Sequence, residues 1–211
     1  MTIDVFNDPG HGGSNSGAIR GTFIEKDVAL SIATDCSEFI SKFPFIVSSM
    51  SRVDDSTISY SDRAKRAKVI ADLVICHHIN AATVERKNDK GEVEIHDDES
   101  RRGAEIFVRH DDAIGGQVAS QILRAMPEQL RAKRTRPWRT SQDGWLKNAD
   151  SILEKYRPLP AILIEWGYVS NEFDREHLLD RRLRFGMSVA VLSGLAKFLE
   201  MTHSSENWLI F

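Results

Sequence analysis

The chain has 211 residues, of which 41% are apolar and 28% are charged, and its formal net charge is −3. This length and apolar fraction suffice for one domain with a buried core, and the charge balance gives no case for nucleic-acid binding. Two cysteines cannot form a disulfide framework and favour synthesis in a reducing compartment. We find no secretory signal sequence and no apolar run of the roughly 18 to 20 residues that span a bilayer. We therefore expect a soluble protein made in the cytoplasm, with no stable membrane insertion.

Short β-branched and aromatic runs alternate with amphipathic segments along the chain. Strands are predicted at residues 3–6, 45–47, 73–76, 104–108 and 161–164, with a further one around 135–140. Helices are predicted at residues 25–40, 60–70, 112–126, 149–156 and 180–200. The strands lie too far apart in sequence for hairpins, which predicts an α/β fold: a mostly parallel central sheet of about six strands with helices on both faces. We expect one domain over residues 1–211, with 200–211 as a tail.

Four residues with catalytic side chains lie at the ends of these elements. His11 follows the first strand in the Gly-rich loop Asn7-Asp8-Pro9-Gly10-His11-Gly12-Gly13, and Glu25 begins the first helix. His78 follows the strand at 73–76, and Glu165 follows the strand at 161–164. Because ligand sites of open α/β sheets gather at the carboxyl ends of the strands, we expect the four to converge on one rim of the sheet.

Two imidazoles and one carboxylate form a common ligand set for catalytic zinc, with a fourth position left for water. The metal lowers the pKa of that water, and a further carboxylate passes its proton to the leaving amine. Glu165 suits this second role because the apolar strand before it and Trp166 after it would desolvate the carboxyl and raise its pKa. The alternatives are an ion-paired strand end for Glu165 and a helix-dipole contact for Glu25.

Five motifs occur in order along the chain. They are the loop around His11, Glu25-Lys26-Asp27, His78-x-Asn80-Ala81, Arg102-Gly103-Ala104-Glu105 and Leu163-Ile164-Glu165-Trp166-Gly167-Tyr168-Val169-Ser170-Asn171. In this set the chain resembles the zinc-dependent N-acetylmuramoyl-L-alanine amidases of the Amidase_3 family. The resemblance covers about residues 2–200.

The resemblance implies one zinc ion per chain, held by His11, Glu25 and His78, with Glu165 as general base and acid. It implies hydrolysis of the amide between N-acetylmuramic acid and L-alanine, and thus degradation of cell-wall peptidoglycan. With no signal peptide found, we expect a phage-type lysin or a hydrolase that reaches the wall by another route of release. Two alternatives stay open: a zinc peptidase acting on muropeptides or free peptides, and an inactive wall-binding homologue.

The chain departs from the family pattern just before the second histidine, where Cys76 replaces the usual serine and His77 fills the next position. A thiolate can bind zinc, but we favour a small buried side chain for Cys76 and expect His77 to face away from the metal, hydrogen-bonded to backbone. The charged segment 82–101 has no apolar stripe with which an inhibitory helix would dock. We therefore expect a surface excursion, activity without a partner protein, and a monomer.

Substrate contacts are expected at Asn80 and Arg63, although Arg63 and Arg52 can equally brace the sheet by ion pairs. The sequence His96-Asp97-Asp98-Glu99 is predicted to be an acidic surface loop rather than a metal site.

Further features lie in the second half of the chain. The basic stretch 124–139 suits a solvated face better than a polymer-binding one. Trp138 and Trp145 fit sugar stacking or core packing equally, and residues 208–211 are expected to dock on the body.

Overall fold

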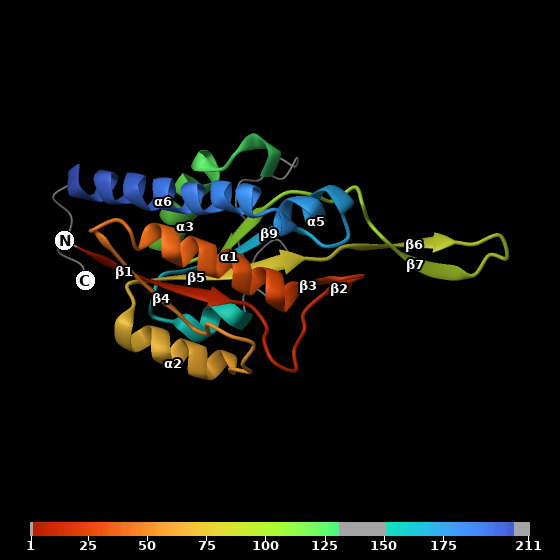
Figure 1. The fold of residues 1–211 in the computed structure, drawn as a ribbon, viewed down its shortest axis with the longest axis horizontal. Helices are drawn as coiled ribbons and strands as arrows, with labels where there is room; N and C mark the ends of the chain where they lie inside the picture. The colour runs from red at the N-terminus through yellow and green to blue at the C-terminus, as the bar shows by residue number, and fades with distance from the viewer. Residues whose placement is uncertain (1, 131–150, 205–211) are drawn as a thin grey trace.

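The computed structural model describes residues 2–130 and 151–204. Its centre is one five-stranded sheet (Figure 1). The strand order is β4 (Ile46–Met50), β1 (Ile3–Pro9), β5 (Leu73–Asn80), β9 (Ala161–Tyr168) and β8 (Glu105–Val108). The first four strands are mutually parallel, and β8 runs antiparallel to β9. The α/β class is confirmed, with five strands rather than about six; the predicted strand at 135–140 falls outside the described residues.

Both faces of the sheet are covered, which explains the uninterrupted apolar runs of β5 and β9. On one face, α1 (Glu25–Ile40), α3 (Ala113–Ala125) and α6 (Arg181–Ser204) enclose the larger core cluster. On the other face, α2 (Tyr60–Ile70) and the 3₁₀ turn η3 (Glu154–Tyr156) pack over a smaller one. Helices on both faces are therefore confirmed, and residues 151–153 are the described helical part of the predicted helix at 149–156.

Several short elements escaped the sequence analysis. Helix α5 (Glu172–Leu179) is capped by the preceding residue, Asn171, whose side-chain oxygen accepts a hydrogen bond from the Asp174 N–H at 3.1 Å. Such a cap satisfies one of the free donors at a helix start. The others are the two-residue strands β2 (Ile19–Arg20) and β3 (Phe23–Ile24), which pair with each other, and the turn η1 (Glu128–Leu130).

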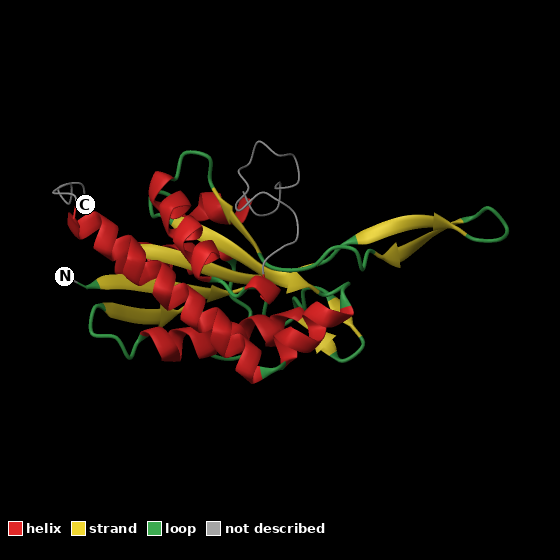
Figure 2. Cartoon of the chain, turned by 90° about the horizontal axis from the view of Figure 1, so that it is seen from above, coloured by secondary structure: helices red, strands yellow, loops and turns green. Residues whose placement is uncertain are grey.

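The segment 82–101 leaves the surface as a β-hairpin of β6 (Thr83–Lys87) and β7 (Val93–Asp97), which projects far from the body in both views (Figures 1 and 2). The predicted surface excursion is confirmed, but its strands were missed because most of their side chains are charged and exposed. Arg20 holds the hairpin base through its Nη2, 2.6 Å from Asp97 Oδ1. The predicted acidic loop at residues 96–99 is therefore in part strand, since His96 and Asp97 end β7, and Asp97 belongs to an ion pair.

Helix α6 is long and apolar enough to be compared with a membrane-spanning helix. Its window Arg181–Thr202 has the length and the mean hydropathy, 1.2, of a membrane-spanning helix. The prediction from the sequence considered only unbroken apolar runs, and α6 is interrupted by charged residues such as Arg184 and Lys197. The composition alone is a weak indication of a membrane, since α6 also serves as a core helix, with Ala190, Val191 and Leu195 fully buried.

The close packing of α6 on α3 can be tested at a glycine. A Cβ atom on Gly194 would lie 2.7 Å from the backbone Cα of Ile122 and 2.5 Å from its Cγ1. We predict that Gly194→Ala lowers the free energy of unfolding by about 1–3 kcal/mol, the usual range for overpacking. Urea denaturation measures this change.

Gly116 in α3 is the matched control, because nothing lies within 4 Å of the Cβ that alanine would add there. Gly116→Ala should stabilise the chain by about 0.5–1 kcal/mol, since alanine loses less backbone entropy in a helix. Equal stability of the two variants would contradict the observed packing of α3 against α6.

Candidate metal centre and active site

The loop after β1 holds His11 in a left-handed conformation, with φ at 59°. Such a conformation is uncommon for a residue other than glycine, so surrounding contacts must maintain it. Arg63 donates from Nη2 to the His11 carbonyl, and Arg52 Nη2 donates to the Gly10 carbonyl at 2.7 Å. Lys26 Nζ donates to the Gly13 carbonyl at 2.9 Å. Three cationic side chains therefore fix successive parts of one loop.

Arg63 is itself buried and needs a buried counter-charge. Its Nη1 lies 2.6 Å from Asp8 Oδ1, which also accepts a hydrogen bond from Ser51 Oγ at 2.5 Å. The other oxygen of Asp8 accepts a hydrogen bond from the Tyr156 hydroxyl. Since breaking a buried ion pair is strongly destabilising, this network ties α2 and η3 firmly to the end of β1.

Glu25 joins the two histidines. Its Oε1 lies 2.9 Å from His11 Nε2 and 3.3 Å from His78 Nδ1, and it also accepts the N–H of Ile79 at 3.0 Å. Its Oε2 accepts the N–H of Ala18 at 2.8 Å. Burial by itself would raise the pKa of Glu25, but the hydrogen bonds from His11 and His78 hold it far below its usual value. The carboxylate is therefore ionised at neutral pH.

The donor set fits a divalent metal ion. Ligand atoms of His11, Glu25 and His78 all lie within 4.8 Å of one another, and no other group within residues 2–130 and 151–204 meets this criterion. The Nε2 atom of His78 is buried without a hydrogen-bond partner among the described residues. Asn15 Oδ1 lies 3.0 Å from His11 Nδ1, which directs His11 Nε2 toward Glu25. A second partner of this kind is typical of metal-binding histidines.

Glu165 lies beside this group on the sheet. Its Cα pairs with that of His78 on β5 and with that of Glu105 on β8. The Glu165 Oε2 atom is buried without a hydrogen-bond partner in the described part of the chain. Burial, and then the charges of Glu25 and Glu105, raise the pKa of Glu165 well above its usual value. A carboxyl with a raised pKa next to a metal site is suited to accept and release a proton.

Cys76 and His77, the two residues before His78, both lie away from the metal group. Cys76 is fully buried in the smaller core cluster, with Sγ 3.8 Å from Asp8 Oδ2, and does not join the metal group. His77 does face away, but it bonds side chains rather than backbone: Trp166 Nε1 donates to Nδ1 at 3.1 Å, and Asn7 Oδ1 lies 2.9 Å from Nε2. Because an indole N–H can only donate, His77 is a neutral imidazole with its proton on Nε2.

Arg63 and Asn80 were expected to contact substrate. Arg63 instead binds the His11 carbonyl and so braces the fold, which was the alternative prediction. Arg52 has the same role through its hydrogen bond to the Gly10 carbonyl. Asn80 is half-buried and faces a pocket of about 250 Å³ beside Glu105 and Tyr168, so its contact with substrate stays a proposal. The Arg131–Arg139 part of the basic stretch, Trp138, Trp145 and residues 208–211 fall outside the described residues.

Three supporting residues were missed by the sequence analysis. Asp8 lies within the loop motif itself, so its position was a usable signal. Asn15 lies four residues after His11, a spacing that carries no general meaning in a loop. Tyr156 is 148 residues from Asp8, and nothing in the sequence connects them.

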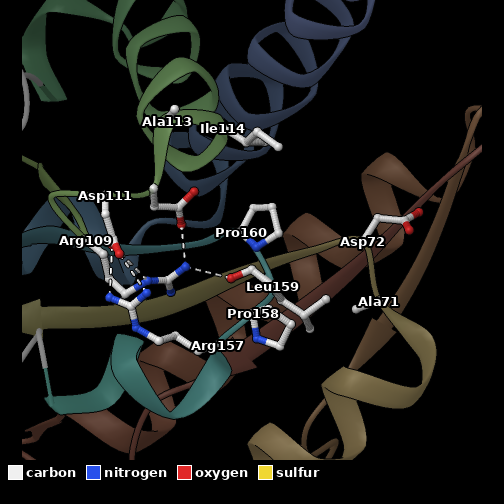
Figure 3. Close-up of a pocket in the computed structure, with 11 residues that line it drawn as sticks. Ala71, Asp72, Arg109, Asp111, Ala113, Ile114, Arg157, Pro158, Leu159 and Pro160 are labelled. Carbon is white, nitrogen blue, oxygen red and sulfur yellow. Dashed lines mark hydrogen bonds and ion pairs between the residues drawn. The ribbon is translucent and has the colours of Figure 1, made fainter. Parts of the chain in front are cut away.

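A larger pocket, about 600 Å³, lies at the opposite end of the sheet, where β5 and β9 begin (Figure 3). Its arginines are matched by acids: Arg157 Nη1 lies 2.7 Å from Asp111 Oδ2, and Arg109 Nη2 lies 3.0 Å from Asp112 Oδ2. Ligand sites of open α/β sheets form at the other end, where the four candidate residues meet. The candidate site is therefore identified by its His, Glu and carboxyl side chains and not by the volume of its cavity.

The α/β sheet brings two imidazoles, the carboxylate that contacts both and a second carboxyl together at the carboxyl ends of its strands, an arrangement that could hold a metal ion. The family model of the N-acetylmuramoyl-L-alanine amidases, Amidase_3, matches residues 5–197. The chain belongs to this family and is therefore an amidase.

Two similar proteins carry the name of the family. The N-acetylmuramoyl-L-alanine amidase LytC of Bacillus subtilis (strain 168) is 29% identical over 177 residues, which cover 82% of this chain and 31% of LytC. The crystal structure of N-acetylmuramoyl-L-alanine amidase from Clostridium difficile 630 matches this chain with a TM-score of 0.73 and 25% sequence identity. The match covers 94% of this chain and 97% of that chain. The match thus spans less than a third of LytC but nearly all of the solved chain.

A third similar structure is that of the CwlD amidase from Clostridioides difficile in complex with the GerS lipoprotein. It has the same fold, with a TM-score of 0.72, 22% identity and coverage of 95% of this chain and 100% of that one.

The spacing of His78 from the Gly-rich loop yields a prediction. A Cβ atom on Gly10 would lie 2.4–2.7 Å from the ring atoms of His78. We predict that Gly10→Ala displaces the ring and lowers the affinity for added Zn²⁺ by more than tenfold, as measured by chelator competition. Gly21→Ala is the control, because the new methyl meets nothing within 4 Å, although φ at Gly21 is positive. It should change stability only, and wild-type affinity in Gly10→Ala would argue against His78 as a ligand.

The position of Cys76 yields a second prediction for the same centre. Cys76→Ser should leave the Zn²⁺ stoichiometry of the purified chain unchanged, because the thiol faces Asp8 in the core and not the imidazoles. His78→Ala should lower that stoichiometry. Metal analysis of both variants, with circular dichroism to confirm folding, would reveal a mistaken ligand set if the serine variant lost its metal.

Proposed function

We propose that the chain hydrolyses the amide between N-acetylmuramic acid and L-alanine in peptidoglycan, using one zinc ion bound by His11, Glu25 and His78. The observation that carries this proposal is the meeting of three ligand side chains within 4.8 Å, beside Glu165 Oε2, which has no hydrogen-bond partner among the residues that the structure describes. Membership of the amidase family supplies the substrate, which the geometry alone does not identify. Peptidoglycan lies outside the cytoplasm, so the chain acts at the wall after release.

The protein residues prepare this centre for the metal. Two neutral imidazoles and one carboxylate suit zinc, which when bound polarises a carbonyl and lowers the pKa of a water molecule. The two backbone N–H groups of Ala18 and Ile79 fix the Glu25 carboxylate in position, and Asn15 fixes the ring of His11. Such fixed ligands avoid the reorganisation that loose side chains would require.

Glu165 moves the proton. As a general base it takes a proton from the attacking water while the water oxygen bonds to the lactyl carbonyl carbon. It then gives that proton to the alanine nitrogen as the C–N bond breaks, so the products are a lactyl carboxylate and a free peptide amine. The raised pKa of Glu165 makes its carboxylate a stronger base and so favours the first of these steps.

Two other functions predict different products. A zinc peptidase with the same residues would cleave only within the peptide, and an inactive wall-binding homologue would release nothing. Mass spectrometry of a digest of purified peptidoglycan distinguishes all three, because only the amidase leaves intact lactyl-ended glycan strands.

The proposal includes a monomer that needs no activator. The hairpin β6–β7 supports only the independence from an activator: it projects away from the body, so the segment 82–101 is no helix docked over the metal group (Figure 2). A purified chain that stays inert on peptidoglycan until a second protein is added would overturn this part.

Replacement of the proton carrier separates chemistry from metal binding. Glu165→Gln should retain zinc and lower kcat by about 10²–10⁴-fold, as expected for loss of a general base. Release of peptide from purified peptidoglycan, measured beside zinc content, tests this. Glu25→Gln is the matched variant: it removes the carboxylate that both histidines contact, so it should lose zinc and activity together. Turnover insensitive to both Glu165→Gln and chelation would refute the mechanism.

A further inference from the structure

Strand β9 is irregular directly after Glu165. The Cα of Glu165 pairs with that of His78, and the next Cα partners are Asn80 and Tyr168, so β9 advances three residues where β5 advances two. The extra residue of β9 lies between Glu165 and Tyr168. Such a bulge interrupts the ladder of backbone hydrogen bonds and redirects neighbouring side chains. Regular strand pairing therefore does not fix the backbone on this side of Glu165.

The Trp166 side chain crosses from the bulge to β5. Its Nε1 donates to His77 Nδ1 at 3.1 Å, and the two rings are nearly parallel, with an interplanar angle of 14° and centroids 6.0 Å apart. Both side chains are buried, with 1% of Trp166 and 0% of His77 exposed. Because alternate residues of a strand point to opposite faces, this hydrogen bond lies on the other face of the sheet from His78 and Glu165. It thus joins the two strands directly behind the proposed metal ligand and proton carrier.

His77 is also part of a longer chain of hydrogen bonds. Its Nδ1 accepts from the indole, so its Nε2 donates to Asn7 Oδ1 at 2.9 Å. Asn7 Nδ2 donates to Ser48 Oγ at 3.0 Å, and Ser48 Oγ lies 2.8 Å from Ser37 Oγ. The chain runs from β9 through β5, β1 and β4 to α1. These include the four elements that carry or directly precede the residues of the proposed metal centre and its proton carrier.

The hydrogen-bonded chain lies among apolar residues. Val5, Ile75 and Ile79, which flank Asn7 and His77 along β1 and β5, belong to the larger core cluster. Apolar side chains tolerate small rearrangements, whereas a buried polar group cannot lose its partner without a penalty. The chain therefore fixes the positions of its strands more narrowly than apolar packing alone would.

We propose that His77 is a positioning residue for Glu165, on which it acts through Trp166. The inference rests on the proposed function. Glu165 Oε2 has no hydrogen-bond partner in the described part of the chain, so the direction of the carboxyl depends on the backbone that carries it. His77 holds the indole of the next residue and so fixes this backbone at the bulge. The carboxyl then stays within reach of the attacking water and of the leaving nitrogen.

The kinetic test removes a single donor. Trp166→Phe keeps a buried aromatic ring but lacks the indole N–H. With zinc-loaded protein and soluble peptidoglycan strands, kcat should fall about 10- to 100-fold, as expected for a misplaced catalytic group, while KM and zinc stoichiometry stay at wild-type values. His77→Leu should cause the same loss of kcat. His77→Gln should retain most of kcat, because one amide can both accept from the indole and donate to Asn7.

The double variant His77→Leu/Trp166→Phe tests whether the two residues act together. Its kcat should be no lower than that of either single variant, because both substitutions remove the same hydrogen bond. Losses of kcat that multiply in the double variant would overturn the inference.

Hydrogen exchange tests the structural step without turnover. In Trp166→Phe the backbone N–H groups of residues 165–169 should exchange about tenfold faster than in the wild type, because the bulge opens more easily without its side-chain bond. Unchanged exchange in this segment would overturn the inference.

Gly194→Ala is the control for a general loss of stability, because it disturbs the packing of α6 on α3 and not the bulge. All assays are made at a temperature at which circular dichroism shows every variant to be folded. Gly194→Ala should then keep wild-type kcat. An equal loss of kcat in Gly194→Ala and Trp166→Phe would reduce the role of His77 to stability alone and overturn the inference.

The remaining outcomes separate this inference from the proposed function. An active wild type with unchanged kcat in Trp166→Phe would overturn the role of His77 and leave the amidase intact. Loss of zinc from Trp166→Phe would do the same, because His77 would then act on the metal ligands. A zinc-loaded wild-type chain that releases no peptide would instead overturn the proposed function, and the inference with it.

Discussion

The loop that presents His11 depends on cations that bind its carbonyl groups. Arg52, Arg63 and Lys26 each donate to a different carbonyl between Gly10 and Gly13. A left-handed residue other than glycine costs about 1–3 kcal/mol, and these charge-assisted hydrogen bonds offset that strain. The constraint extends inward, because Arg63 requires Asp8 and Asp8 requires Tyr156. A single polar network thus connects the smaller core to the geometry of one imidazole.

The rest of the centre follows from where elements begin and end. Glu25 is the first residue of α1, so its carboxylate stands at the positive end of a helix while it contacts both imidazoles. His78 and Glu165 occupy paired positions on adjacent strands. His77 points to the opposite side and is held by Trp166, so the two neighbouring histidines of β5 have separate tasks. The sheet therefore fixes the spacing between His78 and Glu165, the proposed metal ligand and proton carrier.

The sequence predicted the four central residues because each has a local signal: a Gly-rich loop, a helix start, or the end of an apolar strand. It also predicted the class of fold, since buried parallel strands are apolar throughout. The antiparallel direction of β8 and the contact of Tyr156 with Asp8 were beyond reach, because both depend on distant partners. The hairpin was missed for another reason: its exposed strands, with Val93 58% and Ile95 73% accessible, lack the usual buried face.

The position of β9 has a consequence for synthesis on the ribosome. This strand is the last of the five in sequence, yet it lies between β5 and β8, both of which emerge earlier. A nascent chain that has reached residue 130 already carries His11, Glu25 and His78 but has no Glu165. Its sheet must stay open until β9 arrives and fills the gap. The three residues proposed to bind the metal are therefore synthesised before the proposed proton carrier, which arrives only with the strand that closes the sheet.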